Sequence, residues 1–140
     1  MAIIYIEKCD KNRKWQEKLV ISVYKFCSFM KDNYTKEEIL SRAKYIDKAL
    51  SLTKKEFKEL HEPANYFLDE RTTEFLKLYY KDNLTYKNIG DMYHLNGSRV
   101  GQIIHKGYFC LYHIIKCLKF NDNLEEERRK KDAESCTISN

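Results

Sequence analysis

Apolar residues recur every three or four positions in several stretches of the chain, which is the period of an amphipathic helix. In the clearest stretch, from Trp15 to Met30, they fall at positions 15, 19, 20, 23, 26, 27 and 30. Two further helix starts are marked by capping boxes, in which a Thr and the Glu three residues later satisfy free backbone N–H groups. These boxes are Thr35 with Glu38, before the stripe Ile39, Ala43, Ile46 and Leu50, and Thr53 with Glu56, before a short helix that Pro63 stops.

The composition also favours helices. Four Gly and one Pro in 140 residues are too few for the many turns of an all-β sandwich or barrel. We therefore expect an all-α, multi-helix protein, and only Ile3, Ile4 and Ile6 leave a short strand open as an alternative to a docked segment. No apolar run approaches the length of about 20 residues that a membrane helix needs, and the first residues lack a signal-peptide pattern. The expected location is the cytoplasm.

The cysteines do not predict a disulfide framework or a metal site. Five Cys is an odd number, and no two of them form a CxxC pair. Cys110, His113 and Cys117 share a helical face, but a closed zinc site needs a fourth ligand and none follows at a recognisable spacing. We expect reduced thiols, no metal and no cofactor. Because the sequence also lacks a nucleophile–base pairing, a carboxylate pair and a P-loop, it predicts no enzyme.

Positive charge is concentrated in one part of the chain. The net charge is +5, and between positions 85 and 120 only Asp91 opposes five basic residues, Lys87, Arg99, Lys106, Lys116 and Lys119. A surface that faces an anionic partner is therefore expected there.

The same part of the chain predicts a helix-turn-helix. Thr85 can cap a helix that runs to about Tyr93, and Asn96 can cap a second helix after a link of about three residues. Gly90 supplies a small residue where the helices would cross, and Leu95 an apolar plug in the turn. The buried positions would be Ile89, Tyr93, Val100, Ile103 and Ile104. His94 stands where such turns often use Gly with a left-handed backbone. Two ordinary amphipathic helices with a short loop are the alternative.

Four motifs extend this pattern: Leu68-Asp-Glu-Arg71, Phe75-Leu76-x-Leu78-x-Tyr80, Leu84-Thr85-Tyr86-x-x-Ile89-Gly90 and Ser98-Arg99-Val100-x-Gln102-Ile103. Together they resemble region 4 of the sigma-70 family of bacterial transcription initiation factors, over about residues 66–118. The resemblance implies a four-helix DNA-binding domain whose last helix reads a promoter element in the major groove. It also makes RNA polymerase a candidate partner.

The sequence departs from that family at several positions. Thr72 stands where the family has Glu, and Gly97, Ser98 and Gly101 replace charged residues of the reading helix. Family contacts therefore carry over at Arg99 and Gln102, with Lys87 and Lys106 as additions. Residues 1–67 resemble neither the region that melts DNA nor the helix that grips polymerase. We expect a short sigma-like regulator of bacterial or phage type, not a complete sigma factor.

The expected DNA contacts are of two kinds. For base readout, Gln102 can offer paired hydrogen bonds to adenine, Ser98 can bond to several base pairs, and Arg99 can contact guanine or a phosphate. For positioning, Asn96 fixes the helix N-terminus, while Thr85 and Lys87 hold the first helix against the backbone.

The exposed side of the second helix would be completed by His105 and Lys106. Gly97 and Gly101 lie four residues apart on that side in this interpretation, and we expect them to let the helix approach DNA closely.

The chain divides into an N-terminal helical segment (1–67), the helix-turn-helix domain (68–120) and a charged tail (121–140). The second helix is expected to end near Phe120, at the break Asn121–Asp122–Asn123, and the last eight residues are expected to be disordered. Beyond Lys106 its apolar face either packs on the N-terminal helices or, through Tyr108 and Tyr112, forms a homodimer surface.

The sequence thus predicts a sequence-specific DNA-binding transcription regulator whose partner is double-stranded DNA. The alternative is a protein-interaction module that binds RNA polymerase or another regulator without reading DNA.

Overall fold

The structure is a computed structural model that describes residues 13–30, 33–60 and 64–138. The isoleucines at positions 3, 4 and 6 lie outside these residues. The described chain is helical and contains no strand, which confirms the all-α prediction. No helix within it is both long and apolar enough to cross a bilayer.

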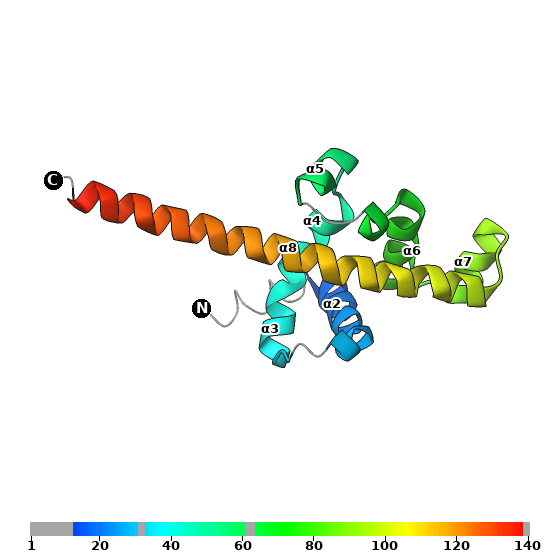
Figure 1. Ribbon diagram of the computed structural model, residues 1–140. Helices are drawn as coiled ribbons and strands as arrows, with labels where there is room; N and C mark the ends of the chain where they lie inside the picture. Colours follow the sequence, from blue (N-terminus) through cyan, green and yellow to red (C-terminus); the bar gives the residue numbers. More distant parts are fainter. Residues whose placement is uncertain (1–12, 31–32, 61–63, 139–140) are drawn as a thin grey trace.

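Helix α8 is the axis of the molecule, and the other elements surround its first half (Figure 1). In Figure 1, α2 and α3 lie on one side of α8, α5 and α6 lie on the other, and α7 closes one end. The elements are α2 (Lys14–Phe26), η1 (Ser28–Met30), α3 (Lys36–Ser41), η2 (Arg42–Tyr45), α4 (Ile46–Leu50), α5 (Lys54–Glu59), η3 (Ala64–Tyr66), α6 (Glu70–Tyr80), α7 (Tyr86–Tyr93) and α8 (Gly97–Ile138).

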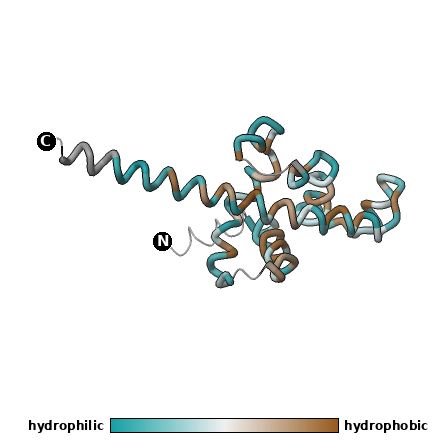
Figure 2. Tube along the Cα trace, in the orientation of Figure 1, coloured by the Kyte–Doolittle hydropathy of each residue, from teal (hydrophilic) through white to brown (hydrophobic). Residues whose placement is uncertain are grey.

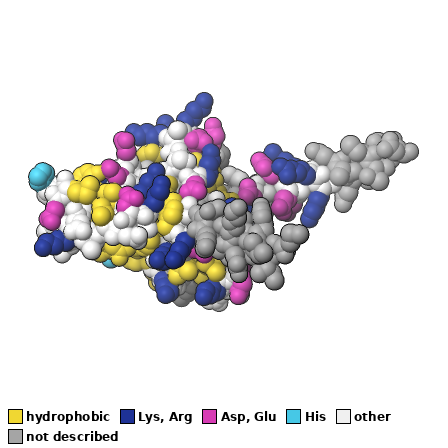
Figure 3. Space-filling view, turned by 180° about the vertical axis from the view of Figure 1, so that it is seen from behind, with side chains coloured by type: hydrophobic (Ala, Val, Ile, Leu, Met, Phe, Trp, Pro, Cys, Tyr) yellow, Lys and Arg dark blue, Asp and Glu magenta, His cyan; other side chains and the backbone are white. Residues whose placement is uncertain are grey.

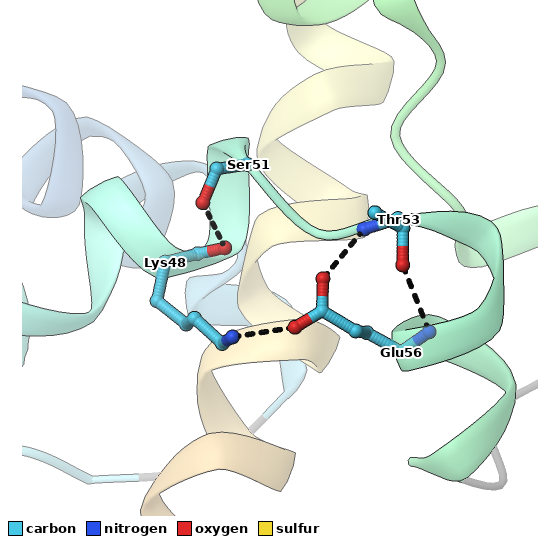
Figure 4. A network of polar contacts seen from close by, with 4 residues as sticks. All are labelled: Lys48, Ser51, Thr53 and Glu56. Carbon is cyan, nitrogen blue, oxygen red and sulfur yellow. Dashed lines mark hydrogen bonds and ion pairs between the residues drawn. The ribbon is translucent and has the colours of Figure 1, made fainter.

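Both predicted capping boxes form. Thr35 Oγ1 accepts from Glu38 N at 3.1 Å, and Thr53 Oγ1 accepts from Glu56 N at 3.1 Å. Glu56 also accepts from Lys48 Nζ at 2.6 Å, which joins α4 to α5 (Figure 4). The hydrogen bond from Lys48, together with those from Thr53, lowers the pKa of the Glu56 carboxyl to about 2. These local bonds explain why the chain turns into α3 and α5 at the predicted residues.

One continuous core joins the N-terminal helices to α6, α7 and α8. Its fully buried side chains come from α2, α4, α6, α7 and the first half of α8. They include Leu19, Val20, Val23, Ile46, Phe75, Leu76, Ile89, Ile104, Leu111 and Ile115. The first half of α8 is also its more hydrophobic half (Figure 2). Burying one aliphatic side chain of this size contributes about 1.5–3 kcal/mol to folding. The N-terminal helices thus pack on α8, as one of the two alternatives predicted.

The other alternative, a homodimer surface built on Tyr108 and Tyr112, is wrong for these two residues. Tyr108 is 6% exposed and Tyr112 1% exposed. Their rings pack against α2, with centroid distances of 5.6 Å from Phe26 to Tyr108 and 5.4 Å from Tyr24 to Tyr112.

The prediction that α8 ends near Phe120 is also wrong, because α8 continues without a break to Ile138. Of the last eight residues, which were expected to be disordered, 133–138 belong to this helix, and 139 and 140 lie outside the described residues. The Tyr45 hydroxyl donates to Asp122 Oδ2 at 2.6 Å, so the expected helix break is tied to the core. Neither Gly nor Pro follows Gly107, and the Glu, Lys and Arg residues beyond Asp122 are good helix formers. Residues 120–131 are exposed, and this mostly hydrophilic part of α8 projects from the molecule (Figure 2).

Candidate nucleic-acid interface

The turn between α7 and α8 forms at the predicted residues. Thr85 Oγ1 accepts from Asn88 N at 3.1 Å at the start of α7, and Asn96 Oδ1 accepts from Arg99 N at 2.8 Å at the start of α8. His94 ends α7 with a left-handed backbone (φ 58°). The two helices therefore have the caps and the turn of a helix-turn-helix.

Gly90 is needed in this turn for a reason that differs from the predicted one. A Cβ at position 90 would collide with the carbonyl oxygen of Leu95 and lie 3.3 Å from its carbonyl carbon. Leu95 N donates to Gly90 O at 2.8 Å, which holds the turn against α7. The element that approaches Gly90 is thus the backbone of the turn, and not α8 itself.

The buried side of the unit has the predicted register. Ile89 and Val100 are fully buried, Ile103 is 8% exposed, and Leu95 is half-buried in the turn. Tyr93, predicted to be buried, is only half-buried, and its ring centroid lies 4.9 Å from that of Phe75 in α6. Packing on α6 therefore fixes the orientation of both helices.

The opposite side of α8 is open to solvent in its first three turns. Ser98, Gln102, His105 and Lys106 are exposed and fall on one side of the helix, since they are spaced three or four residues apart or are adjacent. Arg99 is exposed at the edge of this side, and its Nη1 donates to Gln102 Oε1 at 3.3 Å. We call these five residues the open face of α8.

One flank of the open face is formed by the start of α6. A hollow of about 190 Å³ is lined by Asp69, Arg71 and Thr72 of this region and by four residues of α8, Arg99, Gln102, Ile103 and Lys106. Arg71 thus adds a cation that was not among the predicted contacts. The sequence feature that could have indicated this residue is its position in the Leu68-Asp-Glu-Arg71 motif.

The carboxylate in this flank is balanced by its neighbours. Asp69 caps α6 by accepting from Thr72 N at 2.7 Å. Partial burial raises the pKa of the Asp69 carboxyl, but the hydrogen bonds from Thr72 and the positive charges of Lys106 and Arg71 outweigh it and lower the pKa overall. The flank therefore keeps a net positive character although it contains an acidic residue.

Gly97 and Gly101 do not belong to the open face, which corrects the expectation that they let α8 approach DNA. Gly101 is buried, and a Cβ there would lie 3.2 Å from Cε2 of Tyr86. A Cβ at Gly97 would lie 3.7 Å from the Cβ of the same Tyr86. Gly101 makes room for the first residue of α7, whereas a side chain at Gly97 would meet that residue at an ordinary contact distance.

His105 is exposed, yet its ring is held by the N-terminal part of the chain. It stacks on Phe26 of α2 with a centroid distance of 5.2 Å and an interplanar angle of 23°. The remaining predicted contacts, Thr85, Lys87 and Asn96, are exposed at the starts of α7 and α8.

Charge on the molecule is mixed. On the face shown in Figure 3, Lys and Arg side chains alternate with Asp and Glu and do not merge into one basic patch. This agrees with the modest net charge of +5.

The three residues weighed as metal ligands do not form a site. Cys110 is buried, and burial raises the pKa of its thiol. His113 stacks on Tyr66 with a centroid distance of 4.0 Å. Within the described part of the chain, no group of three or more His, Cys, Asp or Glu residues is placed to hold a metal ion.

These features define an all-α protein with a helix-turn-helix whose second helix leaves a polar face open. Residues 68–113, about a third of the chain, match the family model described as Sigma-70, region 4, and this segment is a sigma region 4-like helix-turn-helix. The match covers α6, α7 and the first part of α8, and it indicates a helix-turn-helix domain of the DNA-binding type. Comparisons of the whole chain with curated proteins and with solved structures gave no match.

Proposed function

We propose that this protein is a sequence-specific DNA-binding transcription regulator that inserts the start of α8 into the major groove. The observation that carries the proposal is the open face of α8, which is polar and exposed while the opposite side of the same turns is buried in the core. A helix fixed by its apolar side, with a polar side free, has the form that major-groove readers share.

Base readout in this proposal comes from Gln102 and Ser98. The Gln102 amide can pair with adenine, and Ser98, one turn earlier on the same side, can bond to a neighbouring base. Arg99 donates to Gln102 at 3.3 Å, so it can orient this amide or turn outward to a guanine or a phosphate.

Backbone contacts come from both flanks of α8. Thr85, Lys87 and Asn96 lie at the starts of α7 and α8, where free N–H groups favour phosphate oxygens. Lys106 and the additional residue Arg71 lie on the α6 flank. Such contacts position the helix without reading sequence.

RNA polymerase is a second proposed partner, and a bacterial or phage origin and a cytoplasmic location are part of the same proposal. One helix-turn-helix contacts few base pairs, so useful specificity requires a second half-site or attachment to polymerase.

A protein-interaction module that never reads DNA is the competing candidate. It is favoured by the mixed charge on the face shown in Figure 3. It is also favoured by Gly97 and Gly101: sigma region 4 carries charged residues at these positions, whereas here both glycines lie against Tyr86.

The deciding experiment is selection of bound duplexes from a random pool by the full-length protein, at low salt. We expect one enriched sequence, whose affinity falls steeply with salt because phosphate contacts release counterions. Gln102→Ala is expected to relax the base preference at one position of the DNA site, whereas Lys106→Ala is expected to weaken binding to all DNA sequences alike. Lys58→Ala, on α5 and away from the site, is the matched control.

The outcome that would contradict the proposal is a pool without enrichment. If the protein then co-purifies with RNA polymerase, the interaction module is the better description.

A further inference from the structure

The N-terminal helix α2 reaches the second flank of the open face, next to the start of α7. Lys18 of α2 lines a hollow of about 560 Å³ together with Tyr79 and Tyr80 of α6 and residues 83–87. These two parts of the chain lie more than 60 residues apart in sequence. The hollow therefore exists only because α2 packs against α6 and α8.

The lining of this hollow suits a phosphate. The lining residues include two lysines, Lys18 and Lys87, and the hydroxyl-bearing residues Thr85, Tyr79 and Tyr86, and none of them is Asp or Glu. The Tyr86 hydroxyl is protonated at neutral pH, like any tyrosine, and can donate to an anion; burial and the neighbouring tyrosines raise its pKa further. Cations combined with neutral O–H donors make strong, charge-assisted hydrogen bonds to phosphate oxygens.

The wall of the hollow is held in place by a cluster of tyrosines. Tyr79 contacts Tyr80 and Tyr86, with ring centroids 4.9 Å apart in both pairs, and the hydroxyls of Tyr80 and Tyr108 are hydrogen-bonded. Tyr86 in turn covers Gly101 of α8. The hollow is thus fixed directly beside the turns of α8 that carry the open face.

Helix α2 contacts this region a second time through Phe26, whose ring stacks on His105. Lys18 and Phe26 are eight residues apart, or about 12 Å along the helix axis. Because Leu19, Val20 and Val23, which lie between them, are fully buried, Lys18 is carried by a helix that is packed on the core and is not on a freely moving segment.

We propose that Lys18 binds a backbone phosphate of the same duplex that α8 contacts, so that the N-terminal segment forms part of the DNA-binding surface. The inference rests on the proposed DNA-binding function. It extends the interface beyond residues 68–113, the part that matches sigma region 4.

The test compares Lys18→Ala with wild type in the full-length protein, using the duplex enriched from the random pool. We expect affinity to fall about 3- to 10-fold and the slope of log affinity against log salt to become shallower by about 1, the amount for one phosphate contact. Lys18→Arg is expected to retain most of the affinity because it keeps the charge. Lys58→Ala makes the same change in net charge on α5 and is expected to leave both quantities unchanged.

Far-UV circular dichroism checks that the variants are folded, which is expected because Lys18 is exposed. If Lys87→Ala weakens binding while Lys18→Ala behaves like Lys58→Ala, the role of Lys18 is refuted and the proposed function stands. If the wild type enriches no duplex, the proposed function fails and the inference fails with it.

Discussion

The first three turns of α8 and the turns that follow both bury one apolar side in the core. They differ in what covers the opposite side of the helix, here called the remaining side. Over residues 97–106 that side is polar and open, and Ser98, Gln102 and Lys106 are exposed. Over residues 107–115 the same side continues with Phe109 and His113, which are half-buried. Tyr66 of η3 covers both of them, with ring centroids at 5.4 Å from Phe109 and 4.0 Å from His113.

This difference divides α8 into an open stretch and a covered one. Where the remaining side is aromatic, a short N-terminal element packs on it and completes the core. Where it is polar, only the ring of Phe26 touches it, at His105, and Ser98, Gln102 and Lys106 remain exposed to a partner outside the chain. The apolar period alone does not distinguish the two stretches, because it reports only the side that both of them bury.

The largest expected effect contrasts the buried side with the open face. Leu111→Ala is expected to lower the free energy of unfolding by about 2–5 kcal/mol, because Leu111 is fully buried and its loss leaves a cavity. Gln102→Ala, on the open face, is expected to change it by less than about 0.5 kcal/mol. Urea unfolding measures both. A similar loss in the two variants would mean that the open face is part of the core.

A smaller loss is expected at the turn that orients the open face. Gly90→Ala is expected to cost about 1–3 kcal/mol, because the new Cβ would collide with the Leu95 carbonyl and the backbone must shift. The matched variant is Gly101→Ala. Its Cβ meets only the ring of Tyr86 at 3.2 Å, which needs to shift by a few tenths of an ångström, and the gain in helix propensity is about 1 kcal/mol.

Thermal unfolding followed by circular dichroism compares the two glycine variants. If Gly101→Ala is the more destabilised of the two, the account of why each glycine is needed is wrong.

Removing the ring that covers Phe109 and His113 tests directly whether the covered and open stretches of α8 differ in their roles. Tyr66→Ala removes the stacked ring from His113 and Phe109, and aromatic pairs contribute about 0.5–1.5 kcal/mol beyond the area that they bury. We expect a loss of at least about 1 kcal/mol in urea unfolding, with DNA affinity unchanged. A change in DNA affinity would show that the covered stretch also belongs to the interface.

The smallest effect concerns the projecting part of α8. Tyr45→Phe removes the hydroxyl that donates to Asp122 and is expected to cost about 1 kcal/mol, because one hydrogen bond is lost and the exposed Asp122 carboxylate can bind water in its place. Hydrogen exchange should become faster around residues 119–123 and stay the same over residues 97–106. Unchanged exchange near Asp122 would indicate that helix propensity alone maintains α8 beyond the core.

Much of the fold could be predicted because its signals are local. The caps at Thr35, Thr53, Thr85 and Asn96 each involve a hydrogen bond across three residues, so residue type and spacing were sufficient. The same holds for the left-handed backbone at His94 and for the buried register of Ile89, Val100 and Ile103.

What failed involved partners distant in sequence. The sequence predicted a helix break at Asp122, but Tyr45, 77 residues earlier, binds this residue within the continuous helix. Gly101 was expected to face DNA, but the ring of Tyr86 covers it. The sequence did not predict that Arg71 and Lys18 lie beside the helix-turn-helix, because their positions depend on how α6 and α2 pack against α7 and α8.

By itself, then, the sequence determined where the helices start, which side of each is buried and which segment is the helix-turn-helix, because these depend on bonds within a few residues and on a fixed helical period. Only the tertiary structure decided which polar residues of α8 remain free, because that depends on which distant element occupies the space beside each of them.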